Sequence, residues 1–389
     1  MSENSVMNTY GRFDVTFERG IGSRLYDIKG KEYIDFVSGV AVNCLGHCHP
    51  VIVNAITEQS KQLIHISNYY WNTKHIELAH KLIKNSDHSK VFFCNSGTEA
   101  VEGALKAARK YGKLKGHHSK NIILYMNNSF HGRSMGALSV TGQPKYQKAF
   151  MPLIGGVKQV EFNDIEALRS SFDENVCGVI IEPIQGEGGV ISASSEFLEE
   201  ARSLCDNYDA LLIFDEIQCG MGRLGSLFAY KKFGVIPDVI TIAKALGGGF
   251  PIGAFVVNER ASISLVPGDH GSTYGGNPLG CAVSLAILKE LVQGGVIASV
   301  EEKSEYLKEK LLTLKEKYGV INEVRGMGLL IGISVEDPKE LMNACFNKGL
   351  LVVTAGTDVV RFLPPLNVTQ EDMDAALNIL EEVLKEKAV

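Results

Sequence analysis

Residues 210–249 read ALLIFDEIQCGMGRLGSLFAYKKFGVIPDVITIAKALGGG and contain two short apolar runs, each followed by polar or glycine-rich residues. The runs Ala210–Ile217 and Asp238–Ala243 have the length and composition of buried strands. Runs of the same kind lie at Val91–Cys94, Asn121–Met126, Val176–Ile184 and Gly253–Val257. Helical patterns at Glu99–Lys113 and Glu196–Tyr208 separate some of them. Alternating strands and helices predict an α/β fold with a mostly parallel sheet covered on both faces.

The last third of the chain follows a different pattern. Helical periodicity covers Cys281–Leu291, Val300–Tyr318, Pro338–Lys348 and Thr369–Lys387, and short strands are expected within Val320–Val335 and Gly349–Leu363. Thr369 is a suitable N-cap for the last helix. Glycine turns near the start of the chain predict a small hairpin unit. We therefore expect a large domain at residues 51–280 and a smaller α+β domain made of residues 1–50 and 281–389.

The composition argues against several classes of partner. The net charge of −6 gives no electrostatic reason to expect nucleic acid or membrane binding. No apolar run reaches the roughly 20 residues that span a bilayer. The polar start has no signal or transit pattern. The eight cysteines are scattered without a C-x-x-C pair, which favours the reducing cytoplasm.

Lys244 directly follows the strand at 238–243 and precedes the glycines 247–249. Burial disfavours the ammonium form and can leave a neutral amine, which a Schiff-base lysine requires. Glycines would let the backbone pass close to a flat ligand. A lysine that leaves the strand end for solvent fits this segment equally well.

Asp215 and Glu216 end the strand at 210–217. In open α/β sheets the carboxyl ends of the strands form the ligand crevice. A buried carboxylate there can keep a pyridine nitrogen protonated through a charge-assisted hydrogen bond. A metal site or a helix cap are the alternatives. Only Cys219 lies nearby at ligand spacing, so no metal site is predicted.

Two further polar turns follow strands. Ser96-Gly97-Thr98 opens a helix, where backbone N–H groups and hydroxyls suit a phosphate, although an ordinary N-cap explains this tripeptide by itself. Phe130-His131-Gly132-Arg133 offers an aromatic ring for stacking and a guanidinium for a carboxylate, although a turn with a surface arginine explains it as well.

Two motifs point to other chemistry and are rejected. Gly220-Met-Gly222-Arg-Leu-Gly225 matches the dinucleotide pattern G-x-G-x-x-G. However, Asp238 begins the next strand instead of ending it, and the intervening segment is too short for a crossover helix. Cys44, His47, Cys48 and His49 suggest zinc, but adjacent Cys48 and His49 do not easily share one tetrahedral site with the other two.

Taken together, the motifs resemble the class-III (ω-amino) aminotransferases, which have the type I fold of pyridoxal-5'-phosphate (PLP) enzymes. The ordered segments are Leu45–His47 with His49-Pro50, Asn95–Ala100, Phe130–Arg133, Glu182–Glu187, Asp215–Gln218, Lys244 and Gly271–Pro278. The resemblance covers nearly the whole chain, and seven motifs in this order are very specific.

The resemblance implies roles around the PLP ring. Lys244 would form the Schiff base with PLP and later carry protons between substrate and cofactor. Asp215 would bond the pyridine nitrogen, and Gln218 would lie near the ring hydroxyl. Phe130 would stack on the ring, and His131 would also contact the cofactor.

The resemblance also implies a phosphate site and a dimer. Ser96, Gly97 and Thr98 would hold the phosphate from the turn that opens the helix. Thr273 would reach the phosphate in the neighbouring subunit, so we expect a homodimer whose active sites each use both chains.

Substrate recognition would rest on two arginines. Arg361 would bind the α-carboxylate of glutamate or 2-oxoglutarate, and Arg133 the other carboxylate. Glu187 would pair with Arg361 when the other amino donor is bound. Ornithine aminotransferases carry tyrosine where this chain appears to carry Val40, which argues against free ornithine as the main donor.

Within the family, Thr141–Gln147 and Arg361–Leu366 are similar to the branch that transfers the amino group of N2-acetylornithine to 2-oxoglutarate in arginine biosynthesis. We expect this reaction, with N-acetylglutamate 5-semialdehyde and glutamate as products. Succinylornithine, ornithine and 4-aminobutyrate stay open as alternative donors. A PLP aminomutase is an alternative of another class.

Overall fold

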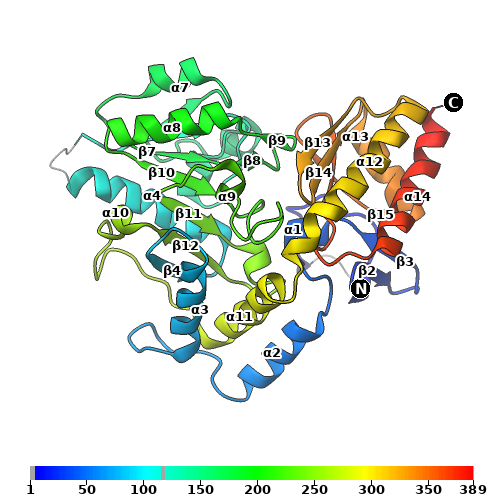
Figure 1. The fold of residues 1–389 in the computed structure, drawn as a ribbon, viewed down its shortest axis with the longest axis horizontal. Helices are drawn as coiled ribbons and strands as arrows, with labels where there is room; N and C mark the ends of the chain where they lie inside the picture. Colours follow the sequence, from blue (N-terminus) through cyan, green and yellow to red (C-terminus); the bar gives the residue numbers. More distant parts are fainter. Residues whose placement is uncertain (1–4, 115–118, 389) are drawn as a thin grey trace.

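The computed structural model describes residues 5–114 and 119–388, which form two lobes (Figure 1). The larger lobe contains a seven-stranded sheet with the order β4-β12-β11-β10-β7-β5-β6. Its strands are β4 (Lys90–Cys94), β12 (Gly253–Val257), β11 (Val239–Ile242), β10 (Leu211–Asp215), β7 (Val176–Ile181), β5 (Ile122–Met126) and β6 (Val157–Val160). Strands pair in parallel from β11 to β6, and only β12 pairs antiparallel with its neighbours. The predicted mostly parallel sheet is confirmed.

Helices cover both faces of this sheet. They are α2 (Pro50–Ser60), α3 (Thr73–Lys84), α4 (Gly97–Leu114), α5 (Met135–Ser139), α6 (Pro144–Gln147), α7 (Ile165–Ser171), α8 (Ser195–Asn207), α9 (Tyr230–Phe233), α10 (Glu259–Ser262) and α11 (Pro278–Val292). Side chains of β10 alternate between two buried clusters. Leu211 and Ile213 pack with residues of α4, whereas Leu212 and Phe214 pack with residues of α8. This period of two explains why the central strands are apolar throughout.

The smaller lobe combines both ends of the chain, as Figure 1 shows by the blue and the orange-red elements on the same side. One sheet has the order β1-β2-β3-β15 and the other β13-β14-β17-β16. These strands are β1 (Phe17–Ile21), β2 (Arg24–Asp27), β3 (Glu32–Asp35), β15 (Leu350–Leu351), β13 (Glu323–Met327), β14 (Leu330–Ser334), β17 (Val359–Phe362) and β16 (Val353–Ala355). Helices α12 (Val300–Tyr318), α13 (Pro338–Lys348) and α14 (Gln370–Lys387) pack on them. The proposed domain limits at residues 50 and 280 stay a prediction.

One predicted strand is divided. The run 176–184 was expected to be continuous, but β7 ends at Ile181 and a separate strand, β8 (Ile184–Gln185), pairs with β9 (Ile191–Ser192). Pro183 lies at the break and lacks the N–H that a central strand must donate. The division turns the chain at Glu182, beside the ends of β10 and β11.

No single helix in the described part of the chain is both long and apolar enough to cross a membrane. The helix pair Pro278–Val292 and Ile297–Tyr318 meets that length and composition only jointly, across a 47° bend.

Candidate active site

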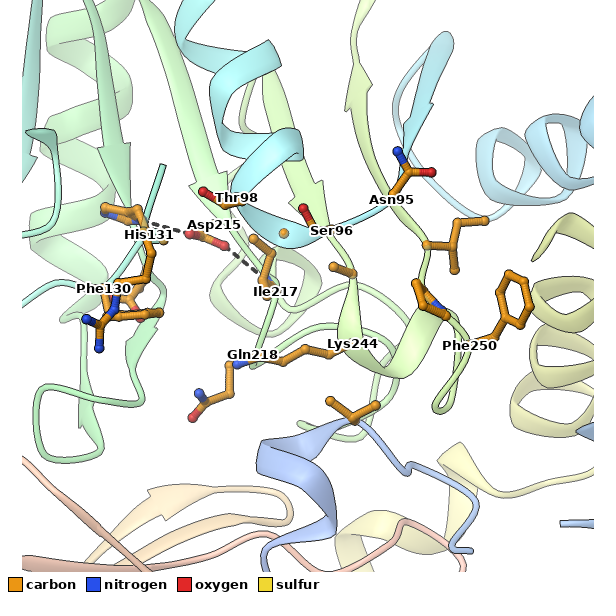
Figure 2. A pocket seen from close by; sticks show the side chains of 18 of the residues that line it. Asn95, Ser96, Thr98, Phe130, His131, Asp215, Ile217, Gln218, Lys244 and Phe250 are labelled. Carbon is orange, nitrogen blue, oxygen red and sulfur yellow. Dashed lines mark hydrogen bonds and ion pairs between the residues drawn. The ribbon is translucent and has the colours of Figure 1, made fainter. Parts of the chain in front are cut away.

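A cavity of about 390 Å³ lies where β4, β10 and β11 end (Figure 2). This is the position at which open α/β sheets bind ligands. Among the predicted site residues, those that line the cavity are Ser96, Gly97, Thr98, Phe130, His131, Arg133, Asp215, Gln218 and Lys244. The sheet therefore brings together side chains from motifs that are far apart in the sequence.

Lys244 extends into this cavity from the end of β11 (Figure 2). Its backbone has φ 44°, a left-handed conformation that non-glycine residues seldom adopt outside functional sites. Burial lowers the pKa of the ammonium group, and Arg361 acts in the same direction, while Glu187 and Asp215 oppose them. Lys244 therefore gives up its proton more readily than an exposed lysine does, as a nucleophilic amine requires.

Asp215 is held rigidly below the cavity. Its Oδ2 lies 2.7 Å from Nδ1 of His131, as Figure 2 shows, and its Oδ1 accepts bonds from the Thr241 hydroxyl at 3.0 Å and the Ile217 N–H at 3.1 Å. A carboxylate has about four acceptor sites, so one remains on Oδ2. Nε2 of His131 is buried without a partner. These contacts fix the orientation of the carboxylate while leaving it able to accept one more proton donor.

The turn between β4 and α4 presents the first N–H groups of an 18-residue helix to the cavity. A Cβ on Gly97 would lie 2.9 Å from the side chain of Ile217, so only glycine fits there without displacement. The Thr98 hydroxyl lies 2.6 Å from the Ser134 hydroxyl. Free N–H groups at the positive end of a helix suit a phosphate.

Glu182 is a cavity residue that the sequence reasoning quoted within a motif without giving it a role. It accepts the Phe130 N–H at 2.9 Å, and burial together with the nearby charge of Asp215 raises its pKa well above the usual range. The signal was available, because Glu182 directly follows a buried strand as Glu216 nearly does. Other cavity residues that were missed are Val42, Asn95, Ile217, Ala243 and Gly249–Ile252.

Arg133 stands at the mouth of the cavity, exposed to solvent. Its guanidinium lies 3.9 Å from the ring centroid of Tyr146 and 5.5 Å from that of Phe130. The two rings meet edge to face at 5.9 Å. Stacking on these rings restrains the cation and leaves its N–H donors available to a carboxylate.

Arg361 and Glu187 do not line the cavity, but they join it through Gln218. Nη2 of Arg361 lies 2.7 Å from Oε1 of Glu187, and Nη1 donates to Oε1 of Gln218 at 2.6 Å. The Gln218 amide also donates to Glu187 at 3.4 Å. Burial alone would raise the pKa of Glu187, but Arg361 and Lys244 outweigh it and lower that pKa. The result is an ion pair with one wholly buried member, Arg361, next to Lys244.

Two predicted residues lie outside the cavity. Thr273 is exposed in the loop before α11, and its proposed role in a neighbouring subunit stays a prediction. Val40 lies in the turn α1 (Ser38–Ala41), where Ser38, Val40 and Ala41 all have positive φ. Val42 lines the cavity instead, so the effect of Val40 on donor choice also stays a prediction.

The two rejected motifs have other structures. The helix after Gly225 is α9, which has four residues and is no crossover helix. His47 bonds Asp35 at 2.7 Å, Cys44 is buried and Cys48 is exposed. In residues 5–114 and 119–388, no group of three or more His, Cys, Asp or Glu side chains is placed to hold a metal ion.

Comparison with known proteins gives consistent results. The family model "Aminotransferase class-III" matches residues 6–384. The acetylornithine aminotransferase of Clostridium acetobutylicum is 63% identical over 99% of this chain and all of that protein. The N-acetylornithine aminotransferase of Stenotrophomonas maltophilia is 39% identical, with a TM-score of 0.86 and 97% of each chain covered. An ornithine aminotransferase of Toxoplasma gondii, described with partial occupancy of PLP at its active site, is 32% identical with a TM-score of 0.94 and covers 99% of this chain and 94% of its own.

Proposed function

The chain belongs to the class-III aminotransferases, which depend on PLP, and we propose that it transfers the terminal amino group of N2-acetylornithine to 2-oxoglutarate. The products are N-acetylglutamate 5-semialdehyde and glutamate, which makes the reaction a step of arginine biosynthesis. The relatives named above support the donor. The observation that carries the proposal is the Glu187–Arg361 ion pair beside Lys244.

This pair suits an enzyme with two different substrates. Glutamate and 2-oxoglutarate bring an α-carboxylate to the reacting carbon, whereas acetylornithine brings a terminal CH₂ group there. When Glu187 moves away, Arg361 can bind the α-carboxylate through a charge-assisted pair. When Glu187 returns, the buried cation is neutralised and the uncharged end of acetylornithine is accepted.

The cavity fits PLP. The remaining acceptor site on Asp215 suits a protonated ring nitrogen, and the first-turn N–H groups of α4 suit the phosphate. Lys244 is the amine within the same cavity. The chemistry that PLP supplies when bound is an aldehyde that takes the amino group and a ring that draws electrons from the reacting carbon.

The residues of the chain then orient the substrate and move the proton. Lys244, with its lowered pKa, takes a proton from the substrate carbon and returns it at the other end of the transfer. Asp215, fixed by His131, keeps its negative charge directed at the ring nitrogen. Arg133 binds the distal carboxylate of either substrate at the mouth of the cavity.

We also propose a cytoplasmic homodimer without nucleic acid or membrane partners, in which Thr273 completes the phosphate site of the neighbouring subunit. All eight cysteines are free and seven of them are buried, as in proteins of a reducing compartment.

The test is a donor panel with purified protein and 2-oxoglutarate, in which glutamate formation is measured. We expect the highest kcat/KM with N2-acetylornithine, and lower values with ornithine, succinylornithine and 4-aminobutyrate. Lys244→Ala should abolish turnover, whereas Lys317→Ala, on the exposed side of α12, should leave it unchanged. A better donor among the others would refute the substrate assignment. Turnover without any keto acid would indicate an aminomutase.

A further inference from the structure

The glycine-rich segment Gly220–Gly225, rejected above as a nucleotide loop, carries a side chain that the proposed reaction does not use, Arg223. Gly222 has φ 93°, and a Cβ on it would lie 3.0 Å from side-chain atoms of Ile297 and Leu366. The segment therefore runs closely against the smaller lobe. Arg223 points into this contact and is only 2% exposed.

The Arg223 side chain bonds the smaller lobe through backbone carbonyls. Its Nη1 donates to the carbonyl oxygens of Leu329 at 3.0 Å and Pro364 at 2.5 Å. The Leu329 N–H donates in return to the Arg223 carbonyl at 2.9 Å. Within the described ranges no carboxylate pairs with this guanidinium, and its Nη2 has no partner. Burial lowers its pKa to about 10, so it still carries a charge at neutral pH.

A buried cation without a carboxylate is costly, which makes a role for its two carbonyl contacts worth seeking. Leu329 directly precedes β14, and Pro364 follows the end of β17. These strands are antiparallel, with Ile331 opposite Phe362, so both carbonyls lie at the same end of the pair. Arg361 belongs to β17 and is paired with Gly332 of β14.

The loop after β10 thus holds the arginine-bearing strand at two points. Gln218 contacts the Arg361 guanidinium itself, and Arg223 contacts the backbone just beyond it. Both contacts come from one loop that begins at Asp215. The position of Arg361 relative to the cavity is therefore fixed from the side of the larger lobe.

We propose that Arg223 is a positioning residue, which sets where β17 presents the guanidinium of Arg361 to the substrate carboxylate. This inference rests on the proposed function, because it takes Arg361 as the group that binds glutamate and 2-oxoglutarate. A clamp that only held the lobes together would affect both substrates alike. A positioning role affects the substrate that Arg361 binds and spares the one for which Glu187 masks it.

The experiment compares Arg223→Met and Arg223→Lys in the holoenzyme. Loss of charge-assisted hydrogen bonds of this kind should raise the KM for 2-oxoglutarate by about tenfold in Arg223→Met. The KM for acetylornithine should stay within about twofold, since Arg361 is neutralised in that complex. Arg223→Lys, which keeps the cation, should give a smaller rise and serves if the methionine variant does not fold.

Arg260→Met is the matched control. Arg260 is another partly buried arginine that donates to backbone carbonyls, those of Cys205 and Ala210, but it lies within the larger lobe and does not line the cavity. It should lower the melting temperature without separating the two KM values.

Arg361→Ala separates this inference from the proposed function. In that background, Arg223→Met should cause no further rise in the KM for 2-oxoglutarate. Equal changes in both KM values, or effects that multiply in the double variant, overturn the positioning role alone. If Arg361→Ala itself leaves the KM for 2-oxoglutarate unchanged, the proposed role of Arg361 fails and the inference fails with it.

Discussion

The protonation of Lys244 is governed by neighbours of opposite sign. Burial lowers its pKa from the ordinary value of 10.5, Glu187 raises it and Arg361 lowers it. Glu187→Gln should therefore lower the pKa of Lys244 further, and Arg361→Ala should raise it. Because the amine becomes nucleophilic as the pH rises through its pKa, the rate at which the apoprotein forms a borohydride-trappable bond with PLP should level off below pH 10.5.

The measurement is the pH profile of that trapping rate in the three proteins. Glu323→Gln is a suitable control, since this exposed carboxylate pairs with Arg325 in the smaller lobe. Shifts of the same sign in both cavity variants would contradict the electrostatic account. A wild-type midpoint at or above 10.5 would contradict burial as its main cause.

At this scale the sequence predicts residue types better than it predicts contacts. Lys244 and Asp215 could be identified because each follows an apolar strand. The bond between His131 and Asp215 could not, because it joins residues on different strands whose order in the sheet is set by packing across the whole lobe. The same holds for the contact of Gln218 with Arg361.

Among the elements, long periodic segments were predicted best. The structure confirms Val300–Tyr318 and Pro338–Lys348 as helices with these ends. Strand β6 was missed because its four residues include the exposed Lys158 and Gln159 at the edge of the sheet, so the apolar run that marks the central strands is absent. An edge strand needs little apolar surface, and its sequence signal is correspondingly weak.

The last helix offers a test of a predicted cap. The Thr369 side chain accepts the N–H of Asp372 at 3.1 Å, and α14 packs its buried face on the smaller lobe. Thr369→Ala should lower the free energy of unfolding by about 1 kcal/mol, because an N–H at the helix start loses its acceptor. The measurement is the denaturant midpoint. Thr313→Ala, at an exposed site inside α12, is the control and should not destabilise; equal losses would exclude capping as the cause.

The whole molecule leaves a group of aromatic side chains uncovered. Tyr69 is 92% exposed and Trp71 is 83% exposed, in the segment between α2 and α3. Asn68 of this segment donates to the carbonyls of Ser272 and Gly275, on either side of Thr273 in sequence. Large exposed aromatics are typical of protein interfaces. This surface therefore supports the proposed dimer, since it adjoins the loop that would complete the neighbouring site.

Trp71 makes that proposal directly measurable, because it is the single tryptophan of the chain. If dimerisation buries it, its fluorescence emission should lie at short wavelength at micromolar concentration and move to longer wavelength on dilution. Specific activity should fall over the same concentration range, because each site would lose the Thr273 of its neighbour. Thr273→Ala should reduce activity while leaving the emission of the concentrated protein unchanged. Full activity together with a water-exposed emission would show that one chain suffices and that the aromatic surface has another purpose.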